Sequence, residues 1–338
     1  MDFRGQSSKA SRGPRVRVIE RKRIEGPGNV QVPGTAASAA SLPARGSICR
    51  EGISGFRMAH IKTLFPPGHF YSPICDPEEL ILHENELWPP MRRASDPTFD
   101  YRVDSQLKLL TAFQQHARDI SFPREAPPDS ATRYYYNNDQ YPCLDAEVLF
   151  CMIRQLSPAA IMEVGSGFST LIMAEVNRRF FDSRIQITCI EPYPRQFLID
   201  GVPGVLRLIR RRVQAVPEAN FERLASCDIL FVDSSHVAKT GSDVNHILFE
   251  ILPRIRSGVY VHFHDIFLPD EYPKLWAIDH GRNWNEQYLL RAFLQYNRAF
   301  EIVWGSYLMG TRHLKEVQEV FPRYPALGGG GSFWLRRI

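Results

Sequence analysis

Short runs of apolar and β-branched residues alternate with longer amphipathic runs over the second half of the chain. The short runs are typical of buried strands, and the longer runs repeat apolar positions every three to four residues, as helices do. The predicted strands are 160–164, 185–190, 205–209, 228–233, 258–265, 300–304 and 332–338. The predicted helices are 146–156, 169–181, 194–199, 221–225, 243–255, 285–296 and 311–321.

Strands separated by helices of this length connect through right-handed crossovers. The order therefore predicts an α/β fold with a doubly wound, mostly parallel sheet that helices cover on both faces. The last helix, the glycine run at 328–331 and the final strand are expected to return antiparallel at the edge of the sheet.

Residues 58–143 differ from the rest, because they are rich in proline and aromatic residues, as in FPPGHFYSPICDP and RYYYNNDQYP. We expect this region to form a cap or lid that contributes to a substrate pocket, and 144–338 to form the main domain. The three consecutive tyrosines, 134–136, are expected to pack rather than to take part in chemistry.

Residues 1–57 form a basic tail, with eleven Lys or Arg against four Asp or Glu, whereas the whole chain has 41 against 37. The tail is rich in Arg, Gly, Pro, Ser and Ala, so it cannot bury enough apolar area to offset the entropy of ordering, and we expect disorder. A solvated extension is favoured over a nucleic-acid-binding arm. A start at Met58 is an alternative, which tryptic peptides from before that residue would exclude.

No apolar run reaches the roughly 18 to 20 residues that a membrane-spanning helix needs, and the basic N-terminus is not followed by the apolar segment of a secretion signal. The six cysteines lack any C-x-x-C pair, which favours buried free thiols in a reducing compartment. We therefore expect a cytoplasmic protein without a membrane partner. The oligomeric state stays open, with a homo-oligomer among the alternatives.

Two glycines, Gly165 and Gly167, directly follow the first strand of the alternating region in the stretch EVGSGFST. Ligands of open parallel sheets bind beyond the carboxyl ends of the strands, and glycine allows positive φ and leaves room for a ligand beside the backbone. A dinucleotide fingerprint would need a third glycine where Thr170 stands. Glu191 ends the next strand and could accept hydrogen bonds from two ribose hydroxyls.

The segment Glu163-Val164-Gly165-Ser166-Gly167 resembles the E-x-G-x-G motif of class I S-adenosylmethionine-dependent methyltransferases, and Glu191 matches their ribose-binding acid. The stretches FVDSSH (231–236) and VHFHDIF (261–267) are similar to the fourth and fifth strand ends of methyltransferase family 24 and of metal-dependent O-methyltransferases. The resemblance spans about residues 130–338. It implies a seven-stranded Rossmann-like sheet and S-adenosyl-L-methionine as the cofactor.

The resemblance also implies cofactor-binding positions, which are Glu163, Gly165, Ser166, Gly167, Glu191, Tyr193 and Asp233. In this assignment the glycine backbone faces the methionine and ribose, Glu163 supports the loop, and Tyr193 packs near the adenine. Two simpler interpretations remain open: Glu163 satisfies nearby backbone amides, and Tyr193 is a turn residue.

Asp233 and Asp265 each end a predicted strand, so their carboxylates should point into one crevice. Two carboxylates suit Mg²⁺, which would lower the pKa of an acceptor hydroxyl. In the metal-dependent O-methyltransferases that this chain resembles, acids at these strand ends hold the metal, and the enzymes acting on sugars carry a histidine three residues after the first acid. His236 stands there, and an ordinary pKa near 6.5 would suit it as a base.

The chain departs from the catechol type, because Ile266 follows Asp265 where that type has Asn, so a third metal ligand is unassigned. His262 and His264 lie inside a predicted strand and are expected to be buried and structural. The predicted function is O-methylation of a small hydroxylated molecule, sugar-like or polyketide-like. The alternatives are an NAD-linked oxidoreductase and a non-catalytic protein whose tail binds nucleic acid or another partner.

Overall fold

The computed structural model describes residues 63–89, 98–128, 131–141, 143–323 and 330–338. Its contacts divide the chain into Met1–Lys62 and Thr63–Ile338, and all of the described helices and strands belong to the second unit. The predictions about the basic tail at 1–57 and about a start at Met58 concern residues outside the described part of the chain.

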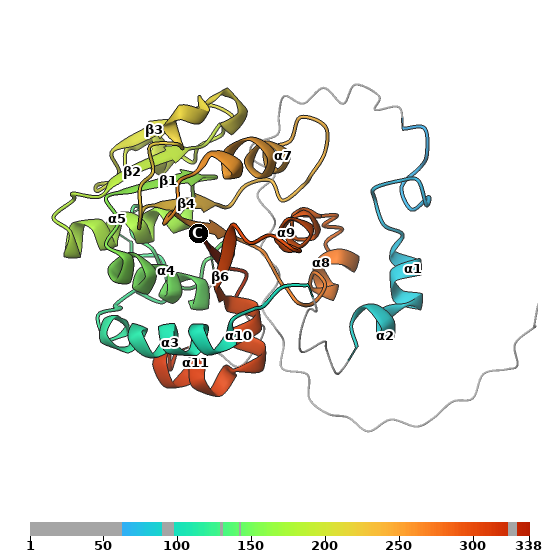
Figure 1. The fold of residues 1–338 in the computed structure, drawn as a ribbon, viewed down its shortest axis with the longest axis horizontal. Coiled ribbons are helices and arrows are strands. Elements are labelled where there is room, and N and C mark those ends of the chain that lie inside the picture. Colours follow the sequence, from blue (N-terminus) through green and yellow to red (C-terminus); the bar gives the residue numbers. More distant parts are fainter. Residues whose placement is uncertain (1–62, 90–97, 129–130, 142, 324–329) are drawn as a thin grey trace, which may run out of the picture. The chain divides into compact units, whose positions relative to one another are not determined.

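The described strands form one sheet in the order β3-β2-β1-β4-β5-β7-β6 (Figure 1). Their bounds are β1 Ala160–Val164, β2 Gln186–Ile190, β3 Arg207–Ile209, β4 Ile229–Val232, β5 Tyr260–Phe263, β6 Phe300–Gly305 and β7 Phe333–Arg337. Strands β1 to β5 pair in parallel, and β7 is antiparallel to both of its neighbours. The predicted α/β fold with a doubly wound, mostly parallel seven-stranded sheet is confirmed.

The final strand is antiparallel, as predicted, but its predicted place at the edge of the sheet is wrong. Phe333 pairs with Phe263 of β5 and with Gly305 of β6, so β7 is inserted between those strands and β6 forms the edge. Phe333, Trp334 and Leu335 are all buried, whereas β6 alternates buried and partly exposed residues. Because successive residues of a strand point to opposite faces, a run of three buried apolar residues favours an inner position covered on both faces.

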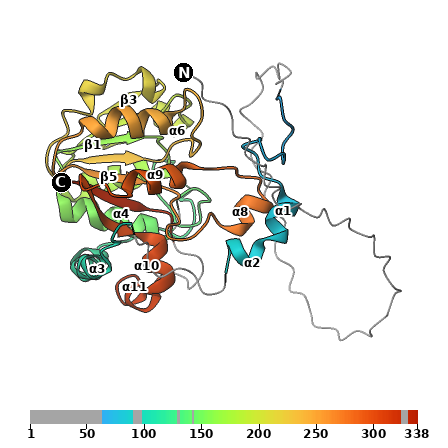
Figure 2. The same ribbon diagram turned by 45° about the vertical axis from the view of Figure 1, so that its right-hand side comes forward.

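Two apolar cores cover the two faces of the sheet. Ile161 of β1 packs in the first core, and Met162, which points the other way, packs in the second. The first core includes residues of α3 Val103–Ala117, α4 Cys143–Leu156, α5 Phe168–Phe180, α6 Gln196–Asp200, α10 Ser306–Arg312 and α11 Leu314–Val320. The second includes residues of α7 Asp243–His246, η3 Ile247–Ile251, η4 Leu252–Arg254 and α9 Glu286–Leu294. Figure 2 shows α3, α10 and α11 together on one side of the sheet.

Three predicted helices differ from the structure. Residues 221–225 form a turn after the short η2 Glu218–Asn220, and the backbone N–H of Ala225 donates to Asp228 instead of continuing a helix. The helix predicted at 243–255 changes from α to π to 3₁₀ geometry along its length, and it ends around Pro253, which has no N–H to donate. The helix predicted at 311–321 begins earlier, as α10, and is divided from α11 at His313.

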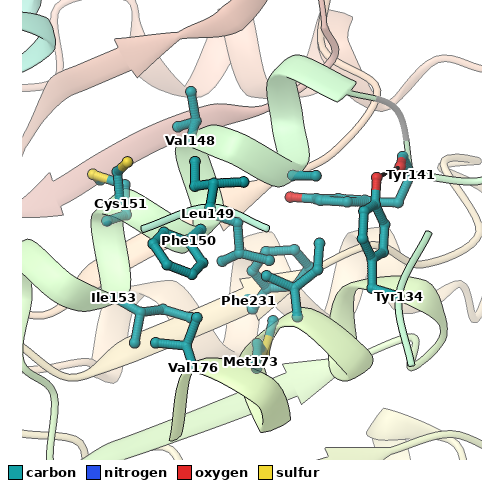
Figure 3. Close-up of a cluster of buried hydrophobic side chains, with 14 of the residues drawn as sticks. Tyr134, Tyr141, Val148, Leu149, Phe150, Cys151, Ile153, Met173, Val176 and Phe231 are labelled. Carbon is teal, nitrogen blue, oxygen red and sulfur yellow. Dashed lines mark hydrogen bonds between the residues drawn. The ribbon is translucent and has the colours of Figure 1, made fainter. Parts of the chain in front are cut away.

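The region before α4 contributes two different kinds of structure. Helices α1 Pro77–Leu82 and α2 Glu84–Leu87 bury no residue, whereas α3 buries Leu110 and Phe113 in the first core. The packing expected of the tyrosine run is confirmed at Tyr134, which is fully buried and donates its hydroxyl to the carbonyl oxygen of Tyr141 at 2.8 Å. Figure 3 shows these two tyrosines beside the core residues of α4.

Among the described cysteines, Cys151 and Cys189 are buried free thiols, as predicted, while the free thiols of Cys75 and Cys227 are exposed. None of the helices in the described ranges has both the length and the hydropathy that crossing a bilayer requires.

Candidate functional site

The carboxyl ends of β1, β2, β4 and β5 meet at one end of the sheet and border two adjoining hollows. The first, which we call the β2-side hollow, has a volume of about 480 Å³ and is lined by Gly165, Glu191, Tyr193 and Asp233 among others. The second, the β5-side hollow, has a volume of about 350 Å³, and its lining includes Gly167, Asp233, His236, Asp265, Arg282 and Trp284. The hollows share Gly165 and residues 233–235, so they adjoin at the ends of β1 and β4.

The two loop glycines are needed for different reasons. Gly165 has a φ of +83°, and a Cβ built on it would lie 1.8 Å from the carbonyl oxygen of Asp233. The close approach that excludes a side chain there is therefore made by the end of β4 and not by a ligand. Gly167 has no atom within 4 Å of a built Cβ, so it is Gly167 that leaves open space at the mouth of the loop.

Glu163 lies behind the loop and lines neither hollow. Its two carboxylate oxygens accept hydrogen bonds from the hydroxyls of Ser169 and Thr170, each at 2.6 Å. Thr170 Oγ1 in turn accepts the backbone N–H of Gly167 at 3.1 Å. The position where a dinucleotide fingerprint has its third glycine thus holds a hydroxyl that connects Glu163 to the loop. Burial raises the pKa of Glu163 to about 7 despite these hydrogen bonds.

Glu191 is the acidic residue next to the glycine loop, as the sequence predicted. One carboxylate oxygen accepts the backbone N–H of Tyr193 at 2.7 Å and the other accepts that of Ser166 at 3.3 Å. Gly165 is joined to the same strand, because its N–H donates to the carbonyl oxygen of Ile190 at 3.0 Å. Tyr193 lines the β2-side hollow, but it is 84% exposed and so lies at the rim.

Asp233, His236 and Asp265 come together in the β5-side hollow. His236 Nε2 lies 3.4 Å from Asp233 Oδ1 and 3.5 Å from Asp265 Oδ2. His236 and Asp265 have φ values of +59° and +57°, a conformation that non-glycine residues adopt rarely and that is concentrated at functional sites. One ligand atom from each of the three residues lies within 4.8 Å of the others, a spacing at which these side chains could hold a metal ion.

Glu286, the first residue of α9, completes this cluster and was missed in the sequence. Its buried carboxylate lies 2.9 Å from His236 Nδ1. Burial opposes the charged imidazolium, but the contacts with Asp233 and Glu286 outweigh burial and raise the pKa of His236 to about 10. The expectation of an ordinary pKa near 6.5 is therefore wrong, and His236 carries a proton at neutral pH in this arrangement.

His264 is buried, as expected, but it also touches the acidic pair. Its Nδ1 lies 3.5 Å from Asp233 Oδ1 and 3.6 Å from Asp265 Oδ1, and its Nε2 lies 3.3 Å from the buried Asp145 Oδ2. Burial lowers the pKa of His264, but the three carboxylates outweigh it and raise the pKa well above its ordinary value. His262 has the structural role expected of it, stacked on Phe231 at 3.8 Å between ring centroids.

Asp145 links this cluster to the C-terminal strand. It accepts the backbone N–H groups of Gly331 and Ser332 at 2.8 and 2.9 Å. A Cβ at Gly330 would lie 2.2 Å from Asp145 Oδ1, so the described end of the glycine run is shaped by this buried carboxylate. Asp145 and Glu286 look in the sequence like ordinary acidic residues near helix starts, and no local pattern marks either of them.

The wall of the β5-side hollow comes from two segments that lie far apart in the sequence. Asp139, Gln140 and Tyr141 belong to the region before α4 and line the hollow, as do Arg282 and Trp284 from the long loop after β5. That loop contains α8 Lys274–Ile278 and packs its own aromatic cluster around Phe267 and Tyr272.

Comparison with known proteins gives one family match and one sequence relative. A family model described as "Methyltransferase domain" matches residues 162–266, from β1 to just past Asp265. A protein of Archaeoglobus fulgidus described as "Uncharacterized protein" is 35% identical over 163 residues, which are 48% of this chain and 74% of that protein.

Similar solved structures include two O-methyltransferases. One is TomG from Streptomyces achromogenes, involved in tomaymycin synthesis and solved with SAM, at 15% identity over 77% of this chain and 96% of that chain, with a TM-score of 0.34. The other is an O-methyltransferase from Bacillus cereus in complex with SAH, at 10% identity over 77% of this chain and 97% of that chain, also with a TM-score of 0.34.

The matched region begins in β1 and contains the glycine loop, the acid that ends β2, and the acids that end β4 and β5. The sheet around it has the mostly parallel order that the motif implied, with one antiparallel strand inserted next to β5. Residues 162–266 therefore form a methyltransferase domain, and the chain resembles the class I S-adenosylmethionine-dependent methyltransferases of family 24.

Proposed function

We propose that the protein transfers a methyl group from S-adenosylmethionine to a hydroxyl of a small hydroxylated molecule. The observation that carries the proposal is the pair of adjoining hollows, which share Gly165 and residues 233–235. The first offers an acid suited to a ribose, and the second offers two carboxylates and an imidazole. A cofactor in the first and an acceptor in the second would meet at the shared residues, which is the arrangement that direct transfer needs.

Glu191 is assigned to the ribose hydroxyls of the cofactor. Each of its oxygens accepts one backbone N–H and retains a lone pair for a ligand. The open space beside Gly167, on the β5 side of the shared residues, suits the methionine part that reaches toward the acceptor, and Tyr193 at the rim of the β2-side hollow suits the adenine. Glu163 acts indirectly, because it holds the hydroxyls at the start of α5 against the loop. When bound, the cofactor supplies a methyl group on a positively charged sulfur.

Asp233 and Asp265 are assigned to a divalent cation. Their carboxylate oxygens lie within 4.8 Å of each other, and two carboxylates with open positions suit Mg²⁺, which leaves His236 Nε2 free for the proton described next. A cation held there would lower the pKa of an acceptor hydroxyl.

His236 is assigned to the proton of that hydroxyl. Its Nδ1 is engaged by Glu286, so the ring is fixed and Nε2 is the nitrogen that faces the β5-side carboxylates. Since its pKa is raised to about 10, His236 can accept a proton at Nε2 only after it has lost the one it holds in this arrangement.

The test combines cofactor binding with methyl transfer. Calorimetry would measure the affinity for S-adenosylhomocysteine, and a labelled methyl group would report transfer to a panel of sugars and polyketide-like hydroxyl compounds. His236→Ala and Asp265→Asn should keep the affinity within about threefold and lower transfer at least about 100-fold. Asp182→Asn is the matched control, because Asp182 is exposed before β2 at the opposite end of the sheet. Collapse of cofactor affinity in both site variants would overturn these roles.

A further inference from the structure

Arg282, in the loop that joins α8 to α9, packs against two tryptophans, Trp276 of α8 and Trp284 of the loop. Its guanidinium carbon lies 4.0 Å from the ring centroid of Trp276 and 4.6 Å from that of Trp284. Its backbone N–H donates to the carbonyl oxygen of Trp276 at 2.9 Å, which closes the loop between them. Contact with two aromatic rings restricts the guanidinium, because cation–π attraction favours an ordered position.

The same arginine lines the β5-side hollow, together with Asp233, His236 and Asp265. Trp284 connects the two groups, because its ring also lies 4.4 Å from the ring of His236. A molecule that places a hydroxyl at the acidic cluster would therefore have Arg282 in the wall of the cavity around it.

The loop that carries Arg282 is braced from several sides. Asp270 forms an ion pair with Arg312 of α10 at 3.2 Å. Asn283, next to Arg282, accepts the backbone N–H of Cys75 at 2.9 Å. Phe267 and Tyr272 pack with Trp276 and Trp284 in a separate apolar cluster. The position of Arg282 is thus set by the fold of this loop.

Arg282 has no anionic partner in the described ranges of the chain, where no carboxylate forms an ion pair with it. Arg312 and Arg154 do have such partners. A guanidinium presents a planar set of N–H donors that matches the oxygens of a carboxylate or phosphate. An arginine that is ordered by stacking, unpaired and exposed to a ligand cavity is suited to bind such a group.

We propose that the acceptor is an anionic hydroxylated molecule whose carboxylate or phosphate group binds Arg282 while its hydroxyl lies at Asp233, His236 and Asp265. This inference rests on the proposed function, and it narrows the substrate class from hydroxylated molecules in general to hydroxy acids and phosphorylated alcohols. Arg282 is a specificity-determining residue in this arrangement and takes no part in proton transfer.

The experiment compares acids with their neutral amides, using the chain saturated with S-adenosylhomocysteine. The probe pairs are 3,4-dihydroxybenzoate with 3,4-dihydroxybenzamide, and glucuronate with glucuronamide, each titrated by calorimetry with Mg²⁺ present; a phosphorylated sugar is titrated against the free sugar in the same way. At least one charged member should bind about tenfold or more tightly than its neutral partner, as expected for a charge-assisted hydrogen bond. Arg282→Gln should abolish the preference, and Arg282→Lys should restore part of it.

Arg298→Gln is the matched control, since Arg298 is exposed before β6, at the other end of the sheet. It should leave the preference unchanged. Equal affinity for charged and neutral partners, no binding of any charged member, or a preference that survives in Arg282→Gln would each overturn the proposal.

The affinity for S-adenosylhomocysteine separates two sources of the anionic group. If Arg282→Gln weakens the binding of S-adenosylhomocysteine about tenfold, Arg282 serves the carboxylate of the cofactor, and the assignment to the acceptor is wrong. If the wild-type chain fails to bind S-adenosylhomocysteine at all, it is the proposed methyltransferase function that fails.

Discussion

Gly165 and Asp233 approach each other so closely that the loop after β1 and the end of β4 have no room for a Cβ between them. The built Cβ of Gly165 would lie 1.8 Å from the carbonyl oxygen of Asp233. The backbone N–H of Asp233 also donates to the carbonyl oxygen of Val164 at 2.9 Å, so the pairing of the two strands brings the segments together. The contact fixes where both hollows meet.

The two glycines of the loop should therefore respond differently to alanine. Gly165→Ala should lower the free energy of unfolding by about 3 kcal/mol or more, because it adds a backbone clash to a positive φ. Gly167→Ala should change it by less than about 1 kcal/mol, since open space surrounds the new methyl group, but it should weaken S-adenosylhomocysteine binding about tenfold or more by filling the hollow. Urea unfolding and calorimetry measure the two effects. Equal stability of both variants would contradict the structure.

Glu191→Gln should weaken the binding of S-adenosylhomocysteine about 30-fold, because a carboxylate that accepts hydrogen bonds from ribose hydroxyls is replaced by an amide with one acceptor oxygen. Calorimetry measures the affinity, and circular dichroism checks the fold. Glu316→Gln, exposed on α11 away from both hollows, is the control and should bind as the wild type does. An unchanged affinity in Glu191→Gln would remove the ribose assignment.

The acidic cluster should bind a divalent cation that chelation removes. We expect calorimetry to show one Mn²⁺ or Mg²⁺ per chain, and Asp265→Asn to lower the affinity at least tenfold because it removes one of the clustered donors. Methyl transfer should stop in EDTA and return when Mg²⁺ is added in excess. The Asp182→Asn variant serves as the control here too. Full transfer in EDTA, with no cation detected, would rule out metal assistance.

The buried Glu147 of α4 should make stability depend on pH. Burial raises its pKa to about 7 from 4.5, although Tyr136 donates a hydrogen bond to it. The folded state then binds a proton more tightly than the unfolded state, so the free energy of unfolding falls as pH rises from about 4.5 to about 7 and levels off above that. Glu147→Gln removes this dependence. The free energy of unfolding of the variant, compared with that of the wild type, should rise by up to about 3 kcal/mol between pH 5 and pH 8.

Urea unfolding of both proteins at a series of pH values measures this difference. Glu319→Gln is a matched control, because the exposed Glu319 lines the same surface hollow as Glu147. The control should follow the wild type at every pH. If the difference in free energy of unfolding between Glu147→Gln and the wild type is the same at every pH, the Glu147 carboxyl keeps an ordinary pKa.

Asp145→Ala should destabilise the C-terminal strand. The buried N–H groups of Gly331 and Ser332, together with His264, would lose their acceptor, which should cost about 3 kcal/mol or more of unfolding free energy. Amide hydrogen exchange in the variant should speed up more in β7 than in β1, relative to the wild type. Asp145→Asn keeps an acceptor oxygen, so its free energy of unfolding should fall less than that of Asp145→Ala. Exchange that speeds up equally in β1 and β7 would point to a global effect instead.

Local patterns were sufficient for most of the fold. Buried strands such as β1 and β4 are short apolar runs, and the helices between them repeat apolar positions, so the parallel sheet followed from the sequence. The position of Glu191 next to Gly165 followed as well, because the carboxyl ends of neighbouring parallel strands lie at the same end of a sheet. The prediction that β7 lies at the edge was wrong, because β6 and β7 are both apolar and their order in the sheet depends on which strand pairs with β5.

The sequence by itself determined which residues end the strands, and with them Gly165, Glu191, Asp233 and Asp265 at one end of the sheet. Only the tertiary structure decided that Glu286 holds His236 and that Asp145 holds His264, across 50 and 119 residues of chain. The reason is physical: strand ends are set by local backbone periodicity, whereas hydrogen bonds between distant side chains, and the pKa values they change, depend on how helices and loops pack around the sheet.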